Sequence, residues 1–493
     1  MTPRLLGTET EFGLSVKDAG AQDPVSNAIL LVNSVGTEVP SRSVLWDYEN
    51  ENPLVDARGF EVEGEKERPA PDYNRLLNKL LANGGRLYVD GAHPEYSTPE
   101  CTRIRDVVRY EKAGERIVEA CRAEADRVAG SRRFVVYKNN TDGKGNSYGY
   151  HENYLVSRAV PFARLVSQLM PFFVTRQVYA GAGKVGAENR SAPTGYQMSQ
   201  RADFFEVLVD LNTMVKRPII NTRDEPHADK AKYRRLHVIV GDSNMSEVTT
   251  YLKLGVTALV IGMIEAGYLV KDLDLADGVR AIKDVSRDLS LKQTIALDDG
   301  RQWTAVQIQE YYLETAQRYC AERGADPETK DILSRWERVL SLLARDPAQL
   351  SREIDWLIKR DLLQSYVERK GCDWDDPRVA MMDLQYHDLR TDKGLFSALD
   401  RGGYVERLLD DGAIEAAVTT PPDDTRAYFR GRCLAKFPDK IYAASWASIL
   451  FDVGNTVVKR IPLNEPSRGT KDLVGALVDE SETVEMLVAR LSA

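Results

Sequence analysis

The segment Arg86–Cys101 (RLYVDGAHPEYSTPEC) carries residue types that could do chemistry. Its first five residues alternate, so Arg86, Tyr88 and Asp90 share one face of a predicted strand and two apolar residues share the other. The strand breaks at Gly91, and a turn-rich stretch then supplies His93, Glu95 and Glu100. A cation, a phenol and a carboxylate on one face indicate a charged ligand. The alternative is an edge strand with a hydrated polar face.

A second alternating strand, Arg4–Leu14, places Glu9 and Glu11 on one face. The rise of about 3.3 Å per residue puts their Cα atoms about 7 Å apart. Carboxylates held this close repel each other unless solvent or bound cations neutralise them. The pair therefore indicates either a cation site or a solvated edge strand.

Imidazole and guanidinium groups occur on two further predicted strands. His151 and Asn153 share a face of the strand around 148–156, which the turn TDGKGN joins to 134–139 as a predicted hairpin. Arg235 and His237 share a face of a later strand, and Arg223 lies in the loop before it. Arginine suits phosphate because its fork of donors matches paired oxygens. The alternatives are an ion-paired loop for Arg223 and a structural role for each histidine.

Together these groups predict a metal and phosphate site. Carboxylates with imidazoles and without thiolates suit Mg²⁺ or Mn²⁺. Such ions, bridging phosphates beside arginines, predict an ATP γ-phosphate site on an antiparallel sheet. The chain has no Walker A motif, and its glycines at 181, 183 and 186 lack the strand and βαβ context of a dinucleotide site. Any nucleotide must therefore be held in another way.

The bulk composition is typical of a globular protein. The chain has 493 residues, 43% hydrophobic and 29% charged, with a net charge of −9. An acidic balance argues against a nucleic-acid partner. The five cysteines are scattered and form no CxxC pair, which predicts a reducing, cytoplasmic location. The N-terminus lacks the apolar region of a signal peptide, and the apolar run 254–264 is too short for a membrane span, so we expect no membrane partner.

The length predicts one large domain and at least one small one. We expect a catalytic domain over 1–427, with an irregular insertion at about 38–72, and a small domain over 428–493. Helical periodicity is clear at 104–128, 305–323 and 327–345, and a further helix is expected over 404–420.

Five blocks resemble the Pup ligase/depupylase family: GTETEFG, RLYVDGAHPEYSTPEC, YKNNTDGKGNSYGYHENYLVSR, INTRDEPHAD and YRRLHVIVGDSNM. The fold of this family is related to glutamine synthetase and the carboxylate-amine ligases. The resemblance therefore implies an α+β fold, with a mainly antiparallel sheet as the active-site cradle, flanking helices and a small C-terminal domain. The long connection between Glu11 and Arg86, which includes WDYENENPLVDARG (46–59), and the form VDGAHPE resemble the depupylase branch.

The resemblance also implies roles for individual residues. Asp90 matches the catalytic aspartate. Mg²⁺ ligands are implied at Glu9, Tyr88 and Glu95, with Glu11, His151 and His237 completing the metal and phosphate end. ATP contacts are implied at Arg86, Thr98 and Trp446, although a tryptophan in such an apolar run is commonly a core residue. Arg223, Arg235 and Asn153 are further candidates for phosphate or substrate contacts.

The implied reaction is hydrolysis of a side-chain amide. The substrate is either the C-terminal glutamine of Pup, the prokaryotic ubiquitin-like protein, or the isopeptide bond between Pup and a lysine of a pupylated protein, in a pathway linked to a bacterial proteasome. ATP is expected as a bound cofactor. Asp90 could attack directly or act through water or phosphate.

Three other functions compete with this prediction. A ligase of the same family would form the isopeptide bond and consume ATP, but the long insertion argues against it. A Pup-binding module without activity is disfavoured because every motif carboxylate is present. A small-molecule carboxylate-amine ligase would fit the fold but not the branch-specific blocks.

Overall fold

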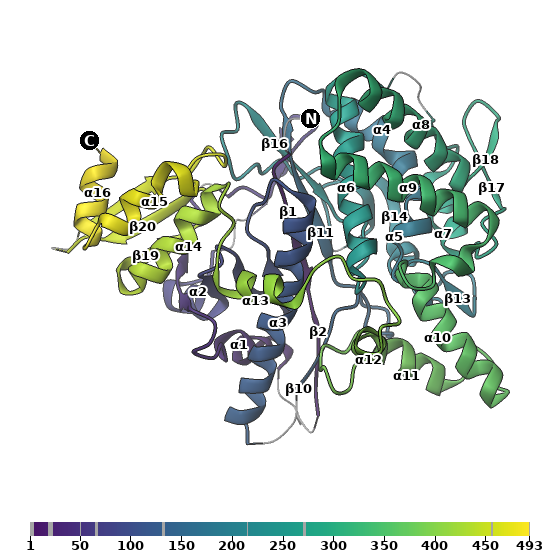
Figure 1. The fold of residues 1–493 in the computed structure, drawn as a ribbon, viewed down its shortest axis with the longest axis horizontal. Helices are drawn as coiled ribbons and strands as arrows, with labels where there is room; N and C mark the ends of the chain where they lie inside the picture. Colours follow the sequence, from purple (N-terminus) through teal and green to yellow (C-terminus); the bar gives the residue numbers. More distant parts are fainter. Residues whose placement is uncertain are drawn as a thin grey trace.

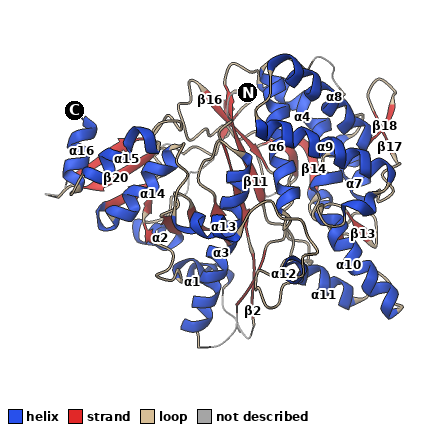
Figure 2. Ribbon diagram, viewed as in Figure 1, coloured by secondary structure: helices blue, strands red, loops and turns tan. Residues whose placement is uncertain are grey.

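A computed structural model of the chain describes residues 4–17, 23–49, 51–64, 68–130, 134–213, 215–269, 273–454 and 457–492. Its centre is a seven-stranded sheet in which every neighbouring pair is antiparallel. The strand order is β16 (Tyr233–Val238), β11 (Tyr150–Ser157), β1 (Leu6–Glu11), β9 (His93–Ser97), β8 (Arg86–Asp90), β7 (Asn78–Leu81) and β3 (Ser41–Ser43). The predicted α+β class with an antiparallel cradle is confirmed, and Figure 2 shows the strands between helices on both sides.

The register of the sheet aligns the polar side chains in rows across the strands. Glu9 faces His151 on β11 and Ser97 on β9. Glu11 faces Glu95, which in turn faces Tyr88 on β8. Directly opposed residues in an antiparallel pair have Cβ atoms about 4.5–5.5 Å apart. The sheet therefore brings together groups that are far apart in the sequence, such as Glu9 and His151, which are separated by 142 positions.

Helices cover the opposite face of the sheet. The long helix α3 (Ile104–Val128) has the bounds expected from its periodicity, and it packs with α6 (Glu247–Glu265) and α1 (Pro24–Asn33) behind the central strands. Helix α6 is the one described helix that is long and apolar enough to cross a membrane, but 89% of its apolar stretch is buried inside the protein. It is a core helix, as the sequence predicts. A helical layer built on α4 (Phe162–Thr175), α8 (Ala305–Arg323) and α9 (Pro327–Arg345) lies beyond it (Figure 1).

The C-terminal residues form a separate small unit, coloured yellow in Figure 1. Its four-stranded sheet has the order β21 (Val458–Pro462), β20 (Ser448–Asp452), β19 (Ile441–Ala444) and β4 (Leu45–Trp46). Three helices pack on it: α14 (Arg426–Lys436), α15 (Lys471–Glu480) and α16 (Val484–Ser492). A second hydrophobic cluster joins residues of this unit, such as Phe429 and Phe451, to Val44 and Leu80. The unit thus takes one strand and part of its core from the predicted insertion.

The remaining elements are shorter or lie at the periphery. They are β2 (Gly13–Val16), β5 (Val55–Asp56), β6 (Phe60–Glu61), α2 (Pro71–Leu77), β10 (Phe134–Tyr137), α5 (Gln177–Ala180), β12 (Lys184–Val185), β13 (Tyr196–Gln197), β14 (Phe205–Asp210), β15 (Arg217–Asn221), α7 (Gly278–Arg287), β17 (Thr294–Ala296), β18 (Gln302–Thr304), α10 (Asp355–Lys370), α11 (Pro377–Tyr386), α12 (Leu395–Arg401), α13 (Asp411–Thr419) and three single-turn 3₁₀ helices at 202–204, 347–350 and 438–440.

Three local expectations are wrong. The helix expected over 404–420 begins only at Asp411, because the Asp410 side chain caps it there, and it ends at Thr419. Strand β10 does not form a hairpin with β11; it pairs with β2 in a separate two-stranded sheet. In the turn, the side chain of Asn139 donates to the carbonyl of Thr141, and the side chain of Asn140 donates to the carbonyl of Tyr148. These side chains take the place of a hairpin ladder, and β11 pairs with β1 and β16 instead. The stretch after Gly91 is also not a loop, because Gly91 (φ 55°) and Ala92 form a two-residue turn that returns the chain as β9.

Candidate active site

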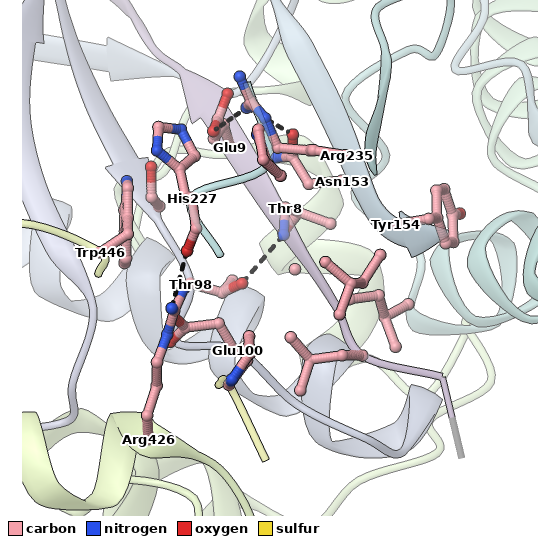
Figure 3. Close-up of a pocket in the computed structure, with 17 residues that line it drawn as sticks. Thr8, Glu9, Thr98, Glu100, Asn153, Tyr154, His227, Arg235, Arg426 and Trp446 are labelled. Atoms are coloured by element: carbon pink, nitrogen blue, oxygen red, sulfur yellow. Dashed lines mark hydrogen bonds and ion pairs between the residues drawn. The ribbon is translucent and has the colours of Figure 1, made fainter. Parts of the chain in front are cut away.

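A pocket lies where the sheet meets the C-terminal unit. Its walls include Glu9, Thr98, Asn153, Arg235 and Trp446, five residues that the sequence analysis selected. Figure 3 shows Glu9 and Arg235 at one side of the pocket and Arg426 with Glu100 at the other. The pocket is therefore made by four strands of the cradle and closed by residues of the C-terminal unit, namely Arg426, Trp446 and Pro466.

Ion pairs fasten the C-terminal unit to the cradle at this pocket. Arg426 Nε donates to Glu100 Oε1 at 2.7 Å, and Arg430 also pairs with Glu100. Arg426 Nη1 donates to the carbonyl oxygen of His227 at 2.7 Å (Figure 3). The two arginines hold the pKa of Glu100 near 2 against the opposing effect of burial. Sequence analysis did not select this clamp, although Arg426 and Arg430 stand one helical turn apart on α14.

The half-buried Trp446 lies beside Thr98 in this pocket. Its ring lies edge-on to Trp46, with centroids 5.4 Å apart. Thr98 Oγ1 accepts a hydrogen bond from the backbone N–H of Thr8 at 2.9 Å, which holds Thr98 against β1. A flat aromatic surface beside an oxygen acceptor suits the base and sugar of a nucleotide.

Arg86, which the resemblance implies as a nucleotide contact, is buried against two aromatic rings. Its buried guanidinium lies between the rings of Trp46 and Tyr88, 3.7 and 3.8 Å from their centroids. Its Nε donates to Asn78 Oδ1 at 3.0 Å. Arg86 therefore stacks the insertion onto the cradle and is absent from the residues that line the pocket.

Beside the pocket, carboxylates and imidazoles form two adjoining clusters that could hold metal ions. One contains Glu9, His151 and His237, and the other contains Glu11, Glu95 and His151, with the candidate ligand atoms of each within 4.8 Å of one another. His151 Nδ1 lies 3.1 Å from Glu9 Oε2 and 4.0 Å from Glu95 Oε1. The buried Glu95 Oε1 has no hydrogen-bond partner among the described residues. An oxygen-rich donor set with such an atom fits a divalent cation.

The charges of the cluster are unbalanced. Burial raises the pKa of Glu95 well above its usual range, and the nearby Asp90 and Glu11 charges add to this. Burial and the Glu95 charge likewise raise the pKa of the Tyr88 phenol. Burial opposes ionisation of Glu9 too, but the hydrogen bond with His151 and the charge of Arg235 lower its pKa to about 2. A cation between these oxygens would remove the repulsion.

His237 is held in a form that can bind a metal. Its Nδ1 lies 2.9 Å from Asn153 Oδ1, an acceptor, so Nδ1 carries the proton and the lone pair of Nε2 remains available. Burial and then the charge of Arg235 lower its pKa well below the usual range, which keeps the ring neutral. Asn153 also accepts from Arg235 Nη1 at 2.9 Å, so it orients both residues as well as lining the pocket.

Asp90 stands at the end of β8, where the sheet opens to solvent. Its side chain is exposed, yet the protein around it restricts hydration, and this desolvation followed by the charge of Glu11 raises its pKa. It lies opposite His93 across the turn. A carboxylate with a raised pKa beside a candidate metal cluster is placed to act as a base or nucleophile.

The insertion docks on the loop that carries Arg223. Thr222 Oγ1 donates to Asp56 Oδ2 at 2.5 Å, and the N–H of Ala57 donates to the carbonyl of Thr222 at 2.7 Å. Arg223 Nε is buried without a hydrogen-bond partner among the described residues, and its charge lowers the pKa of Glu9 and opposes the rise at Asp90. Arg223 therefore supplies positive charge to the cradle, as Arg235 does from the adjacent strand.

Besides Asp90, the sequence indicates twelve binding or metal-ligating residues, and all twelve lie on or beside the same face of the cradle as Asp90. Six of them surround the candidate metal positions, namely Glu9, Glu11, Tyr88, Glu95, His151 and His237. Thr98, Asn153, Arg235 and Trp446 line the pocket, Arg223 acts on it through charge, and Arg86 lies behind it.

The chain matches the family model described as Pup-ligase protein over residues 4–450. It is 51% identical to the depupylase of Acidothermus cellulolyticus and 47% identical to the Pup deamidase/depupylase of Mycolicibacterium smegmatis, with 99% of each chain covered in both cases. A Pup–protein ligase of Actinosynnema mirum is 47% identical over 86% of this chain and 92% of that protein.

Two solved structures share the fold. The crystal structure of the complex between Pup and its ligase PafA has a TM-score of 0.82 and 35% identity, and covers 99% of this chain and 93% of that one. A structure of the ligase PafA with ADP has a TM-score of 0.76 and 37% identity, and covers 87% and 96% of the two chains. These matches agree with the candidate metal cluster of the cradle, and the chain belongs to the Pup ligase family.

Proposed function

We propose that this protein is an amidohydrolase that deamidates the C-terminal glutamine of Pup and cleaves the isopeptide bond between Pup and a substrate lysine. The observation that carries the choice of branch is sequence identity over the full chain: two depupylases are 51% and 47% identical over 99% of it, whereas a Pup–protein ligase that covers 97% of it is 42% identical. In this structure the insertion contributes β4 to the C-terminal sheet and docks on the Arg223 loop. It is thus built into the architecture of the site.

ATP and Mg²⁺ are the proposed cofactors. Glu9, Tyr88, Glu95, Glu11, His151 and His237 would hold the metal ions, and Thr98, Asn153, Arg235 and Trp446 would hold the nucleotide, with Arg223 supplying charge at the phosphates. The bound metal–nucleotide complex supplies positive charge and phosphate oxygens next to the scissile amide. The residues beyond 427 would close the nucleotide pocket as a small domain.

The chain's own residues position and activate the attacking group. Asp90 lies at the open end of the cradle with a raised pKa, which makes its carboxylate a stronger base. It either attacks the amide carbon, releasing ammonia or the lysine amine and leaving an anhydride that water opens, or takes a proton from an attacking water. Hydrolysis in H₂¹⁸O separates the two routes, because only direct attack leaves ¹⁸O in Asp90 after repeated turnover.

Pup ending in glutamine, incubated with the protein, Mg²⁺ and ATP, tests the function. We expect ammonia release and a mass gain of about one dalton, with far less ADP than ammonia, because amide hydrolysis is downhill without coupling. ADP formed in equal amount would contradict ATP as a bound cofactor.

The ligase alternative needs a separate reaction. Pup ending in glutamate, a target protein and ATP are mixed with the enzyme, and the products are resolved by mass. A new Pup conjugate accompanied by stoichiometric ADP would assign the chain to the ligase branch. We expect cleavage of a preformed conjugate instead. Pup and pupylated proteins are the proposed partners, in a cytoplasmic pathway linked to a bacterial proteasome.

A further inference from the structure

Two arginines near the Glu11 end of β1 have no carboxylate partner among the described residues. Arg201 is 2% exposed, and its Nη1 donates to the carbonyl of Ile239 while its Nε has no hydrogen-bond partner among the described residues. Arg217 Nη2 donates to the carbonyl of Ser147 at 2.6 Å. Among the described residues, neither guanidinium forms an ion pair.

Two other buried arginines of this protein are neutralised by carboxylates. Arg176 meets Glu152 at 2.5 Å, and Arg426 meets Glu100 at 2.7 Å. Burial followed by the like charge of Arg217 lowers the pKa of Arg201 to about 10, and burial also lowers the pKa of Arg217. Keeping two unpaired guanidinium groups together is unfavourable unless an anion joins them.

The fold places this pair beyond the metal cluster, on the side away from the nucleotide pocket. Along β1, residues 5–9 line the pocket and Glu11 lies at the other end. The Glu11 charge acts on both arginines. Gly149 adjoins the cluster so closely that a Cβ there would lie 2.6 Å from Glu11 Oε1, and Ser147, which binds Arg217, is two residues away.

Both arginines also lie close to Phe205 on β14. Arg217 opens β15 and pairs in register with Phe205 on β14. The Arg201 guanidinium lies 5.7 Å from the centroid of the same Phe205 ring. Arg201 reaches the carbonyl of Ile239, just after the strand that carries Arg235 and His237.

The proposed substrate offers one anion at a fixed position. A C-terminal glutamine keeps its main-chain carboxylate free, and so does the residue whose side chain forms the isopeptide bond. In both reactions a carboxylate therefore lies on the same residue as the scissile amide. A guanidinium pair matches such a group in charge and donor geometry.

We propose that Arg201 and Arg217 bind the main-chain carboxylate of the substrate's C-terminal residue and thereby restrict hydrolysis to a side-chain amide at a chain end. This inference rests on the proposed function, and deepens it by assigning a substrate subsite. Nucleotide, metal and substrate carboxylate would then follow one another along the cradle.

The test compares two synthetic forms of Pup ending in glutamine, one with a free C-terminal carboxylate and one with a C-terminal carboxamide. Ammonia release is followed for the wild type, Arg217→Gln and the control Arg280→Gln. Arg280 is the control because its side chain is 79% exposed and, among the described residues, forms an ion pair only with Asp284. Urea unfolding of each variant checks that the fold is retained.

We expect the wild type and Arg280→Gln to prefer the free carboxylate by about 10- to 100-fold in kcat/KM. Arg217→Gln should lose most of its rate on the free carboxylate and show little further loss on the carboxamide, because both changes remove the same contact.

Equal hydrolysis of both forms by the wild type would overturn the subsite while leaving the proposed function intact. No hydrolysis of the free-carboxylate form would instead overturn the proposed function. Equal losses in Arg217→Gln on both substrates would show that Arg217 acts on phosphate or on the fold, and would also overturn the subsite. The carboxamide comparison in the wild type needs no substitution, so the test stands even if a variant fails to fold.

Discussion

The two faces of strands β1 and β11 carry polar side chains in opposite states. Glu9, Glu11 and His151 point to the candidate site, and Thr8, Tyr150 and Glu152 alternate with them and point to the helices. Both faces are largely removed from water. Among the described residues, Thr8, Tyr150 and Glu152 on the face toward the helices all have hydrogen-bond partners, whereas the other face has an excess of carboxylates around Glu95 Oε1, which has none.

The helix-facing network satisfies its charges internally. Lys138 Nζ lies 2.7 Å from both Glu111 and Glu115, and the Tyr150 hydroxyl donates to Glu111 Oε2 at 2.7 Å. Glu152 accepts from both terminal nitrogens of Arg176, at 2.5 and 2.9 Å. Such a network holds the two central strands in register without needing a ligand.

The difference shows which charges belong to the fold and which await a ligand. Buried ions in a structural role are paired, because an uncompensated charge is unfavourable. When the buried charged side chains on one face of a sheet are paired and those on the other face are not, the face with the unpaired charges is the functional one. The comparison predicts that substitutions on the site face affect activity, and those on the helix face affect stability.

Asp90→Asn should give the largest effect. Removing the base or nucleophile is expected to lower kcat by roughly 10²- to 10⁴-fold, while ATP still binds and stability is little changed. Ammonia release, calorimetric ATP titration and urea unfolding measure the three quantities. Substantial remaining activity would remove Asp90 from the catalytic role.

Glu152→Gln breaks the helix-facing network. Both Glu152 and Arg176 are buried, so losing one charge should cost about 3–5 kcal/mol of unfolding free energy. Glu415→Gln is the matched control, because Glu415 forms a surface ion pair with Arg116 and is 72% exposed, so its loss should cost less than about 1 kcal/mol. Equal urea midpoints for the two variants would contradict a structural role for the network.

Much of the site face was predictable from the sequence because strand alternation has a period of two. Glu9 with Glu11, and Arg235 with His237, share a face for that reason alone. Helix α3 was predictable to its bounds because its apolar period and the glycine after it are local signals.

Strand pairing and the helix-facing network were not predictable in the same way. The turn at 141–146 suggested a hairpin, but pairing is decided by strands far away in the chain. Glu100 finds Arg426 across 326 positions, and no local pattern encodes that contact. Tyr150 is bonded to Glu111 on α3 and Glu152 to Arg176 at the end of α4, so the strand sequence alone shows only that two polar groups face the core.

Glu95→Gln tests the imbalance on the site face through pH. In metal-free protein the raised pKa means that folded Glu95 holds its proton at a pH where the unfolded chain has lost it. Its contribution to stability is therefore full below pH ~4.5 and declines by up to about 1.4 kcal/mol per pH unit as the pH rises toward the folded pKa. Urea unfolding in EDTA should show this decline for the wild type and a flatter profile for Glu95→Gln. Parallel pH profiles for the two proteins would mean that the protein balances the Glu95 charge even without a metal ion.

Thr8→Val gives the smallest expected effect and the sharpest comparison of the two faces. Thr8 Oγ1 donates to Glu111 Oε2 at 3.2 Å from the strand residue directly before Glu9. Valine keeps the side-chain shape and removes one hydrogen bond, which should cost about 0.5–1.5 kcal/mol, whereas Thr8→Ser keeps the hydroxyl and should retain that contribution. Because Glu111 keeps Lys138 and Tyr150 as partners, the strand should stay in register and kcat should be unchanged. If the fall in kcat, expressed as a free energy, exceeds the loss in unfolding free energy, residues on the helix face affect the site directly. The separation of the two faces would then fail.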